Sequence, residues 1–596
     1  MTAKPSIIAD PQAALKQARQ LLASDPKAAI RQARQLLETS PEDPALLRLL
    51  GTALRRNGEE AEAQAIEKRA IDASTRSPAH REAARAVAAG DKQRAAAILE
   101  GLIARDENDV VALVMLGLQF SLEAEYAIAE ALLRKAVAAA PGDPAARMAL
   151  VEHLHRARRA ADALEELDKL ATETPASQSL RASILRDLGR QEEEVAVLKG
   201  LAEADPRMPA YRIRLGHAYR TLGRADDAIA AYRSVIAQAP HEGTSWWSLA
   251  NLKTMKFSDA EIAQMQGGLA NPQSPLTNRI RLSFALGKAF EDRGEHEQAF
   301  RHYEEGNRMR MTIATYRPEK LDHWVDDAEL AYSKEFFADR AGWGFPARDP
   351  IFVVGLQRSG STLVEQILDS HPEIEGTAEL TELPTIIREQ SEIAHRRGIG
   401  FEEHLKRMSS DDLRGLGEDY MQRSRLYRFT DKRLFTDKMP VNWLYVGIIR
   451  LILPNARIVD VRRHPLACCF ANWKQLYGKG LEHTYSMENM GRYYANYVRL
   501  MRLVDDLQPG NIHRVIYEQM VDDVEGEVRR LLDYLGLPFD EACLNFHSNE
   551  RSVRTISAEQ VRRPINREGL DRWKPYEQWL GPLKTALGGA LETWDQ

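Results

Sequence analysis

A short glycine-containing loop is the stretch of the sequence best suited to hold an anion. The apolar run Ile351–Val354 before it has the composition of a buried parallel strand, and apolar residues recur at helical spacing after Ser361. Glycines at 355 and 360 let successive N–H groups point inward, beside the positive end of the helix dipole. The spacing is that of a nucleotide-binding P-loop, but Ser361 stands where the phosphate-binding lysine is expected. A positive charge lies inside the loop instead, at Arg358, which argues against a kinase or an ATPase.

Strands and helices alternate through residues 347–596. Arg457–Val461 and Arg514–Tyr517 are expected to be further buried strands, and Trp443–Leu453 an apolar helix. This alternation predicts a three-layer, P-loop-like α/β domain with a central parallel sheet. Ligands usually bind such sheets at the carboxyl ends of the strands, and Arg463 follows one of these strands.

The first half of the chain is repetitive and helical. Prolines at 141, 175, 206 and 240 are separated by 34, 31 and 34 residues. The clearest unit, Pro209–Pro240, and a second one, Leu286–Tyr303, combine small residues with tyrosines at matching positions. A period near 34 is characteristic of tetratricopeptide repeats, and the array resembles that family.

The resemblance implies an all-α superhelix over residues 1–313, whose concave face binds an extended peptide or another protein. The alternative, that the array only scaffolds or dimerises the second domain, has equal weight, since repeats carry no chemistry. Residues 314–346 are predicted to be a helical connector, with one helix at Lys320–Phe336 and a hinge at Gly342–Pro346.

Composition and charge exclude several classes of protein. The 596 residues carry a formal net charge of -6, which offers no basic field for nucleic acid. The three cysteines have neither disulfide nor zinc-ligand spacing. We expect no signal peptide and no membrane span, and a cytoplasmic location.

Six blocks in the second half resemble one enzyme family and occur in its order. These blocks are Arg358–Thr362, His371–Glu373 with Glu379, Asp437–Lys438, Val461–Arg463, Val515–Gln519 and Ser557–Asn566. They resemble the tyrosylprotein sulfotransferase branch of the sulfotransferases that use 3′-phosphoadenylyl sulfate (PAPS). The resemblance implies transfer of a sulfonyl group from PAPS, as cosubstrate, to an acceptor hydroxyl or amine. The acceptor would be a protein tyrosine, a glycan, a lipid or a small molecule.

The resemblance assigns catalytic roles to three residues. Glu379 would be the general base that deprotonates the acceptor. Lys438 would stabilise the leaving phosphate oxygen, and Ser557 would bind the phosphate region and steer that lysine. Without the family match, a solvated loop carboxylate would be the better interpretation of Glu379. No metal is expected, because there is no triphosphate to clamp.

The resemblance also assigns residues to the donor. The loop residues would cradle its 5′-phosphosulfate, and Arg463, Tyr517, Ser557 and Arg563 would contact the nucleotide. Arg462 either shares the task of Arg463 or faces outward, and a core tyrosine is nearly as good an account of Tyr517. The loop residues in question are Arg358, Ser359, Gly360, Ser361 and Thr362.

Two positions depart from the family pattern at the 3′-phosphate. Ala471 stands where relatives carry a serine, and Gln475 stands where they carry a basic residue. Either Asn472 and Lys474 compensate, or the affinity for the donor is reduced.

Two rival functions stay open from the sequence. A P-loop kinase would require a lysine at 361, which is absent. A binding scaffold would use the repeat array alone and leave the α/β domain inactive, an alternative to which Ala471 gives some weight.

Overall fold

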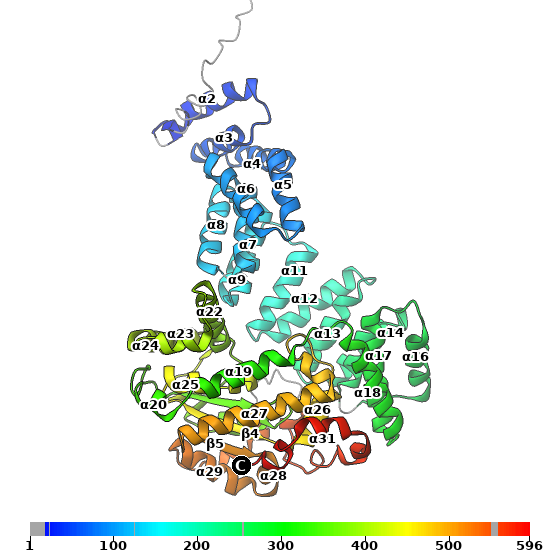
Figure 1. Ribbon diagram of the computed structural model, residues 1–596. Coiled ribbons are helices and arrows are strands. Elements are labelled where there is room, and N and C mark those ends of the chain that lie inside the picture. Colours follow the sequence, from blue (N-terminus) through cyan, green and yellow to red (C-terminus); the bar gives the residue numbers. More distant parts are fainter. Residues whose placement is uncertain (1–17, 19, 23, 124, 253–254, 550–557) are drawn as a thin grey trace, which may run out of the picture. The chain divides into compact units, whose positions relative to one another are not determined.

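The computed structural model describes residues 18, 20–22, 24–123, 125–252, 255–549 and 558–596. The chain forms two compact units, which divide between Arg224 and Ala225 (Figure 1). Each unit has its own hydrophobic clusters. None of the helices within these described ranges is long and apolar enough to cross a membrane.

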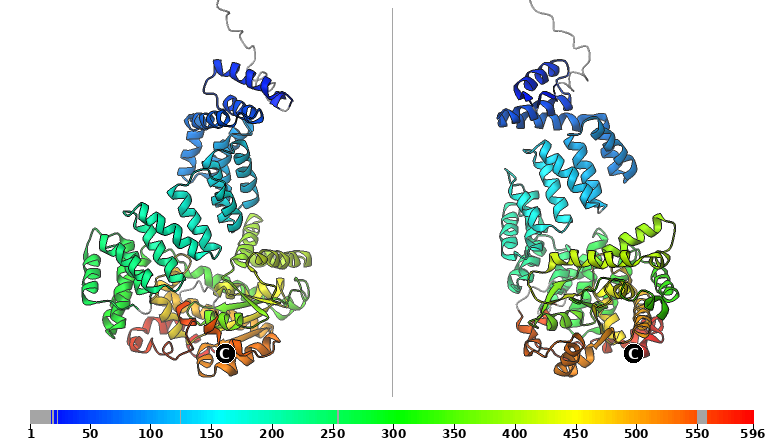
Figure 2. Two further views of the ribbon diagram at one scale, coloured as in Figure 1. Left: turned by 180° about the vertical axis from the view of Figure 1, so that it is seen from behind. Right: turned by 90° about the vertical axis from the view of Figure 1, so that its left-hand side faces the viewer.

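The first unit consists of helices that pack in consecutive antiparallel pairs, stacked one on the next (Figure 2). Aspartate and proline define several helix starts: Asp43 accepts hydrogen bonds from the backbone N–H groups of Ala45 and Leu46, and Pro44 is the first helical residue. Between neighbouring pairs, leucines such as Leu150 and Leu154 are buried. The helices are α2 (Pro26–Thr39), α3 (Pro44–Arg56), α4 (Glu60–Arg76), α5 (Pro78–Ala88), α6 (Lys92–Arg105), α7 (Val110–Leu122), α8 (Tyr126–Ala139), α9 (Pro144–Arg156), α10 (Ala160–Asp168), α11 (Pro175–Asp187), α12 (Gln191–Ala204) and α13 (Pro209–Thr221). The predicted helical array is therefore confirmed.

The second unit begins with the last repeat helices. In the pair α17–α18, a Cβ at Gly287 would lie 2.6 Å from Cδ1 of Tyr303, so only glycine lets the two helices approach this closely. The hydroxyl of Tyr303 donates to Oε2 of Glu291 at 2.8 Å. The five helices are α14 (Ala225–Gln238), α15 (Gly243–Ala250), α16 (Asp259–Ala270), α17 (Leu276–Asp292) and α18 (His296–Met311). The predicted pairing of a small residue with a tyrosine therefore holds in this repeat.

The segment predicted to connect two domains lies inside the second unit. The single helix expected at Lys320–Phe336 is two helices, α19 (Pro318–Ala331) and α20 (Lys334–Ala338). They separate because Ser333 starts α20 by accepting a hydrogen bond from the N–H of Phe336 at 3.0 Å. The indole of Trp324 on α19 donates to the Leu444 carbonyl at 3.0 Å, which fixes α19 to the α/β part.

Five parallel strands form one sheet in the order β2-β3-β1-β4-β5. Sequence patterns predict neither β2, which is short and contains a glycine, nor β3, which has only four residues. The strand expected at Arg514–Tyr517 ends one residue early, and Tyr517 begins a helix instead. The strands are β1 (Pro350–Gly355), β2 (Ile374–Ala378), β3 (Leu434–Asp437), β4 (Arg457–Arg462) and β5 (Ile512–Ile516).

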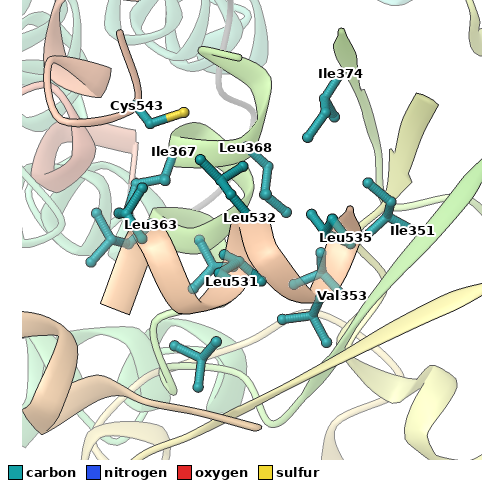
Figure 3. Close-up of a cluster of buried hydrophobic side chains, with 14 of the residues drawn as sticks. Ile351, Val353, Leu363, Ile367, Leu368, Ile374, Leu531, Leu532, Leu535 and Cys543 are labelled. Carbon is teal, nitrogen blue, oxygen red and sulfur yellow. The ribbon is translucent and has the colours of Figure 1, made fainter. Parts of the chain in front are cut away.

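Helices cover both faces of this sheet, as predicted. Ile351 and Val353 of β1 pack against Ile367 and Leu531 on one face (Figure 3), whereas Phe352 points to the other face, where its ring lies 5.3 Å from that of Tyr420. The helix expected at Trp443–Leu453 consists of a 3-10 turn, Pro440–Tyr445, followed by a short α-helix. The remaining helices are α21 (Ser361–Asp369), α22 (Glu382–Arg396), α23 (Phe401–Arg407), α24 (Ser410–Ser424), α25 (Val446–Ile452), α26 (Pro465–Trp473), α27 (Met487–Leu507), α28 (Tyr517–Asp522), α29 (Val524–Leu535), α30 (Ala558–Val561), α31 (Gly581–Leu587) and α32 (Ala590–Thr593).

Candidate active site

The carboxyl edge of the sheet gathers the predicted site residues from distant parts of the chain. Glu379 follows β2, Lys438 follows β3, Arg358 lies in the loop after β1, Arg463 follows β4 and Tyr517 follows β5. Because all five strands are parallel, their carboxyl ends meet at this one edge. The parallel sheet therefore brings the five residues to one edge.

The loop after β1 has the curled backbone that its glycines predict. Gly360 has a φ of 105°, and Arg358 has a φ of 66°, an uncommon left-handed value for a residue with a side chain. A Cβ at Gly360 would lie 2.6 Å from Cδ2 of Tyr517. Gly360 caps α21 and has no side chain to accept a hydrogen bond from its first N–H groups. This end of α21 therefore presents N–H donors where an anion would be stabilised.

A cleft of about 550 Å³ opens beside this loop, within the roughly 300–1,000 Å³ of ordinary ligand sites. Helix α17 contributes Lys288 and Glu291 to its wall, and His296 of α18 is also part of it. The predicted donor-binding residues that line the cleft are Arg358, Gly360, Ser361, Thr362, Arg463, Tyr517 and Arg563.

One predicted donor-binding residue, Ser359, does not line this cleft. Ser359 is buried within the loop, and its Oγ has no hydrogen-bond partner within the described part of the chain. Ser557 lies outside the described residues.

Arg463 is held over the loop by backbone and ring contacts. Its Nη1 donates to the Arg358 carbonyl at 3.2 Å, and its Nη2 donates to the Gly569 carbonyl. The guanidinium carbon lies 4.9 Å from the ring centroid of Tyr517. Among the described residues nothing accepts a hydrogen bond from its buried Nε, so one donor of this side chain is left for a ligand.

Arg462 corrects an expectation. It neither joins Arg463 nor faces outward, because its side chain is fully buried. Its Nε donates to Oδ2 of Asp460 at 2.7 Å, and its Nη1 donates to the Gln596 carbonyl at 3.2 Å. Alternation along β4 sends these two neighbours to opposite sides, so Arg462 stabilises the fold.

Glu379 and Lys438 form an ion pair at the same edge. The Nζ of Lys438 donates to Oε1 of Glu379 at 2.5 Å and lies 4.0 Å from Oε2 of Glu365. The Lys438 side chain is 2% exposed, whereas that of Glu379 is 48% exposed. The solvent-exposed carboxylate of Glu379 is thus paired directly with the buried ammonium group of Lys438.

This pair lies outside the lining of the 550 Å³ cleft. The pKa of the Tyr477 phenol is raised, chiefly by burial, and both Arg358 and Glu379 lie near enough to influence it. The phenol donates to Oδ1 of Asn472 at 2.8 Å. Tyr477 is therefore a neighbour of both groups that sequence reasoning missed, because no motif marks it.

Asp437, the neighbour of Lys438, is fully buried. Its Oδ2 accepts hydrogen bonds from the hydroxyl of Tyr420 at 2.9 Å and from Nδ2 of Asn442 at 3.4 Å. Burial raises the pKa of its carboxyl to about 8, although the hydrogen bond from Tyr420 acts in the opposite direction. The side chain faces away from solvent and anchors the end of β3.

A second, smaller cavity adjoins the cleft, and Ala471 lines it. Arg572 and Lys474 line it as well. Sequence reasoning missed Arg572 because it lies beyond the last block that resembles the family. Within the described ranges, no three His, Cys, Asp or Glu side chains are grouped so that they could hold a metal ion.

Comparison with known families agrees with this architecture. A model described as the sulfotransferase family matches residues 350–541, and a tetratricopeptide repeat model matches residues 9–78, 124–178 and 213–252. An uncharacterized protein of Aquifex aeolicus is 26% identical over 338 residues, which cover 56% of this chain but only 44% of that relative. The chain thus matches less than half the length of that relative.

Two further comparisons concern the α/β part. A putative protein-tyrosine sulfotransferase of Caenorhabditis briggsae is 24% identical over 235 residues, 37% of this chain and 80% of the relative. The sulfotransferase domain of an olefin synthase from Synechococcus PCC 7002 is 20% identical with a TM-score of 0.31, and covers 43% of this chain and 98% of its own. The chain therefore joins tetratricopeptide repeats to a sulfotransferase-family domain at residues 350–541.

Proposed function

We propose that this protein transfers a sulfonyl group from PAPS to an acceptor hydroxyl. The observation that carries the proposal is the single sheet edge at which a cationic, glycine-containing loop and the Glu379–Lys438 pair stand together. One element suits a polyanionic donor, and the other suits proton transfer from an acceptor.

The residues around the cleft match the chemistry of the donor. Its phosphate and sulfate oxygens accept hydrogen bonds only, and the start of α21 offers N–H donors. The buried Nε of Arg463 lacks a partner within the described chain, and such an atom costs free energy unless a ligand or water satisfies it. An anion in the cleft would accept this hydrogen bond. Arg563, on the rim of the cleft, would contact the nucleotide.

In the proposed reaction, Glu379 accepts the proton of the acceptor hydroxyl, whose oxygen then attacks sulfur. Lys438 stabilises the negative charge that collects on the phosphate oxygen as the sulfur–oxygen bond breaks. Adenosine 3′,5′-bisphosphate leaves as the second product. In this structure, the ammonium group of Lys438 donates a hydrogen bond to Glu379. In the reaction it must therefore turn from this carboxylate toward the phosphate of PAPS. Ser557 keeps its proposed role in steering Lys438.

For the acceptor, we propose tyrosine in a protein. Relatives named protein-tyrosine sulfotransferases support this choice, at 24% identity or less, and a repeat array that binds extended peptides would deliver such a substrate. A glycan or a small hydroxyl compound is the alternative. The three buried, unpaired cysteines support a reducing, cytoplasmic location.

The test combines binding with turnover on the full chain. Calorimetry should detect binding of adenosine 3′,5′-bisphosphate, and labelled sulfate should move from PAPS to a member of a panel of tyrosine peptides, oligosaccharides and small phenols. No binding of the bisphosphate at millimolar concentration would contradict the proposal and favour a scaffold. Transfer of phosphate from ATP with magnesium would instead favour a kinase.

A further inference from the structure

The small cavity beside the cleft is surrounded by positive charge. Arg358, Arg463, Lys474 and Arg572 all line it, and its described lining contains no carboxylate. Like charges that share a small, partly dry space repel one another strongly. Such a cluster is most stable with an anion in its centre.

These four cations lie around one cavity, and the pKa values of two of them respond to the others. The pKa of Lys474 is lowered by burial, despite the opposing effect of Glu291, and Arg572 and Arg358 lower it further. Burial likewise lowers the pKa of Arg358, and Arg463 and Arg572 add to this effect. Arg572 lines the same cavity as both other side chains, although it is distant from them in sequence.

The repeat helices hold Lys474 in place. Its Nζ donates to Oε1 of Glu291 on α17 at 2.5 Å, and both side chains are largely buried. The other oxygen of Glu291 accepts the hydrogen bond from Tyr303. One residue earlier, the Trp473 carbonyl accepts a hydrogen bond from Nδ2 of Asn307 on α18 at 3.0 Å. Helices α17 and α18 thus fix the end of α26, where Lys474 stands.

Asn472 is excluded from this role. Its Nδ2 donates to the carbonyls of Gln357 at 2.7 Å and Cys468 at 2.9 Å, and its Oδ1 accepts from Tyr477. The amide is fully used in holding the loop against α26. Of the two residues that the sequence suggested as substitutes near Ala471, only Lys474 lines the cavity.

We propose that Lys474 and Arg572 complete, with Arg463, the subsite for the 3′-phosphate of the donor. This inference rests on the proposed function. Ala471 leaves room in the cavity, and the cations arrive instead from the end of α26 and from the segment before Trp573. The terminal repeat thereby becomes part of the donor site, because Glu291 on α17 positions Lys474.

Arg572 can turn to a phosphate at little cost. Its side chain is 52% exposed and lies 3.6 Å from Oε2 of Glu568, and its Nε donates to the Glu568 carbonyl at 3.2 Å. Exposed ion pairs of this kind contribute little to stability, about 1 kcal/mol or less. A doubly charged phosphate in the cavity would be a stronger partner.

Calorimetry with two nucleotides tests the inference on the full chain. Wild type should bind adenosine 3′,5′-bisphosphate far more tightly than adenosine 5′-monophosphate. Arg572→Ala should weaken binding of the bisphosphate by about 10- to 100-fold, the value of a hydrogen-bonded charge, and change binding of the monophosphate less than about threefold. The matched control is Arg567→Ala, an exposed arginine paired with Asp522, which should leave both affinities unchanged.

The role of Lys474 is tested with a double variant that carries both Lys474→Met and Glu291→Gln. The second change is needed because Lys474→Met alone would leave the buried Glu291 carboxylate without its ion-pair partner. The double variant should show the same selective loss, and its thermal unfolding reports whether it folds. Equal losses for both nucleotides, or unchanged bisphosphate affinity in both variants, would overturn the inference. If wild type binds neither nucleotide, the proposed function itself fails, and the inference fails with it.

Discussion

At the scale of single residues, Glu379 and Lys438 differ in how much solvent reaches them. The Glu379 carboxylate is half exposed, whereas the Lys438 ammonium group is buried among Glu379 and Glu365. A buried ammonium acts strongly on nearby charge because little water screens it. In the proposed reaction, the exposed carboxylate would meet the acceptor and the buried ammonium group would meet the leaving group.

Substitution Glu379→Gln should separate binding from chemistry. We expect turnover to fall by about 10²- to 10⁴-fold, the usual contribution of a general base, while the affinity for adenosine 3′,5′-bisphosphate changes less than about threefold. Single-turnover transfer and calorimetry measure the two quantities. Glu392→Gln, an exposed carboxylate on α22, is the control and should keep full activity. Retained turnover in Glu379→Gln would remove this residue from the mechanism.

Asp437 predicts how stability responds to pH. Its folded-state pKa of about 8 lies above the ordinary aspartate value. As the pH rises, the unfolded chain therefore loses this proton at a lower pH than the folded chain does. Its contribution to stability is full below about pH 4 and is lost as pH rises to about 8. Asp437→Asn should therefore reduce the decline in the free energy of unfolding between pH 5 and 8, by about 1.4 kcal/mol per pKa unit removed.

Denaturant unfolding at several pH values measures this slope. Asp431→Asn changes an exposed carboxylate in the same segment and should leave the slope as in wild type. An unchanged slope in Asp437→Asn would mean that this carboxyl titrates normally in the folded chain.

At the scale of elements, the loop after β1 depends on one glycine. Gly360 has a φ of 105°, and a Cβ at this position would lie 2.6 Å from Cδ2 of the Tyr517 ring. The same position caps α21. Strand β1, the loop, α21 and the ring of Tyr517 at the start of α28 thus form one cradle.

Substitution Gly360→Ala should damage this cradle. We expect a loss of about 1–3 kcal/mol in stability from the backbone strain, and at least a tenfold loss in affinity for adenosine 3′,5′-bisphosphate as the loop moves from Tyr517. Gly415→Ala is the matched control, since a Cβ there meets nothing within 4 Å and alanine favours a helix interior by about 0.5–1 kcal/mol. Unchanged affinity in Gly360→Ala would show that the loop does not contact the nucleotide.

At the scale of the second unit, the last repeat and the α/β part share one core. The ring of Phe300 on α18 stacks on Trp473 and on Trp579, each at a centroid distance of 5.1 Å. The ion pair between Glu291 and Lys474 lies beside it. Loss of this core should be felt both in stability and at the proposed donor site.

Phe300→Ala should destabilise this unit by about 3–5 kcal/mol, the usual cost of removing a buried phenylalanine. The transition to follow in thermal unfolding is the one that adenosine 3′,5′-bisphosphate raises, because a ligand stabilises the unit that binds it. Phe429→Ala is the control, since that ring is 88% exposed and its loss should cost about 0.5 kcal/mol or less. A wild-type midpoint for Phe300→Ala would mean that the repeat packs only loosely on the α/β part.

Local sequence patterns predict the features of this protein that depend on neighbouring residues. Proline spacing revealed the repeats, alternating apolar runs revealed the parallel sheet, and the glycines at 355 and 360 revealed the curled loop. The same local patterns placed Arg463 at a strand end. Strand ends were less exact, as Tyr517 shows, because the sheet rather than the local run decides where pairing stops.

Which distant side chains meet depends on the packing of whole elements. The order β2-β3-β1-β4-β5 brings Glu379 to Lys438, and the alternation of β4 buries Arg462 while Arg463 reaches the cleft. Packing of α17 on the end of α26 brings Glu291 to Lys474, although 183 positions separate them. No local sequence pattern predicts these side-chain contacts. They follow from how whole helices and strands bury their apolar faces against one another.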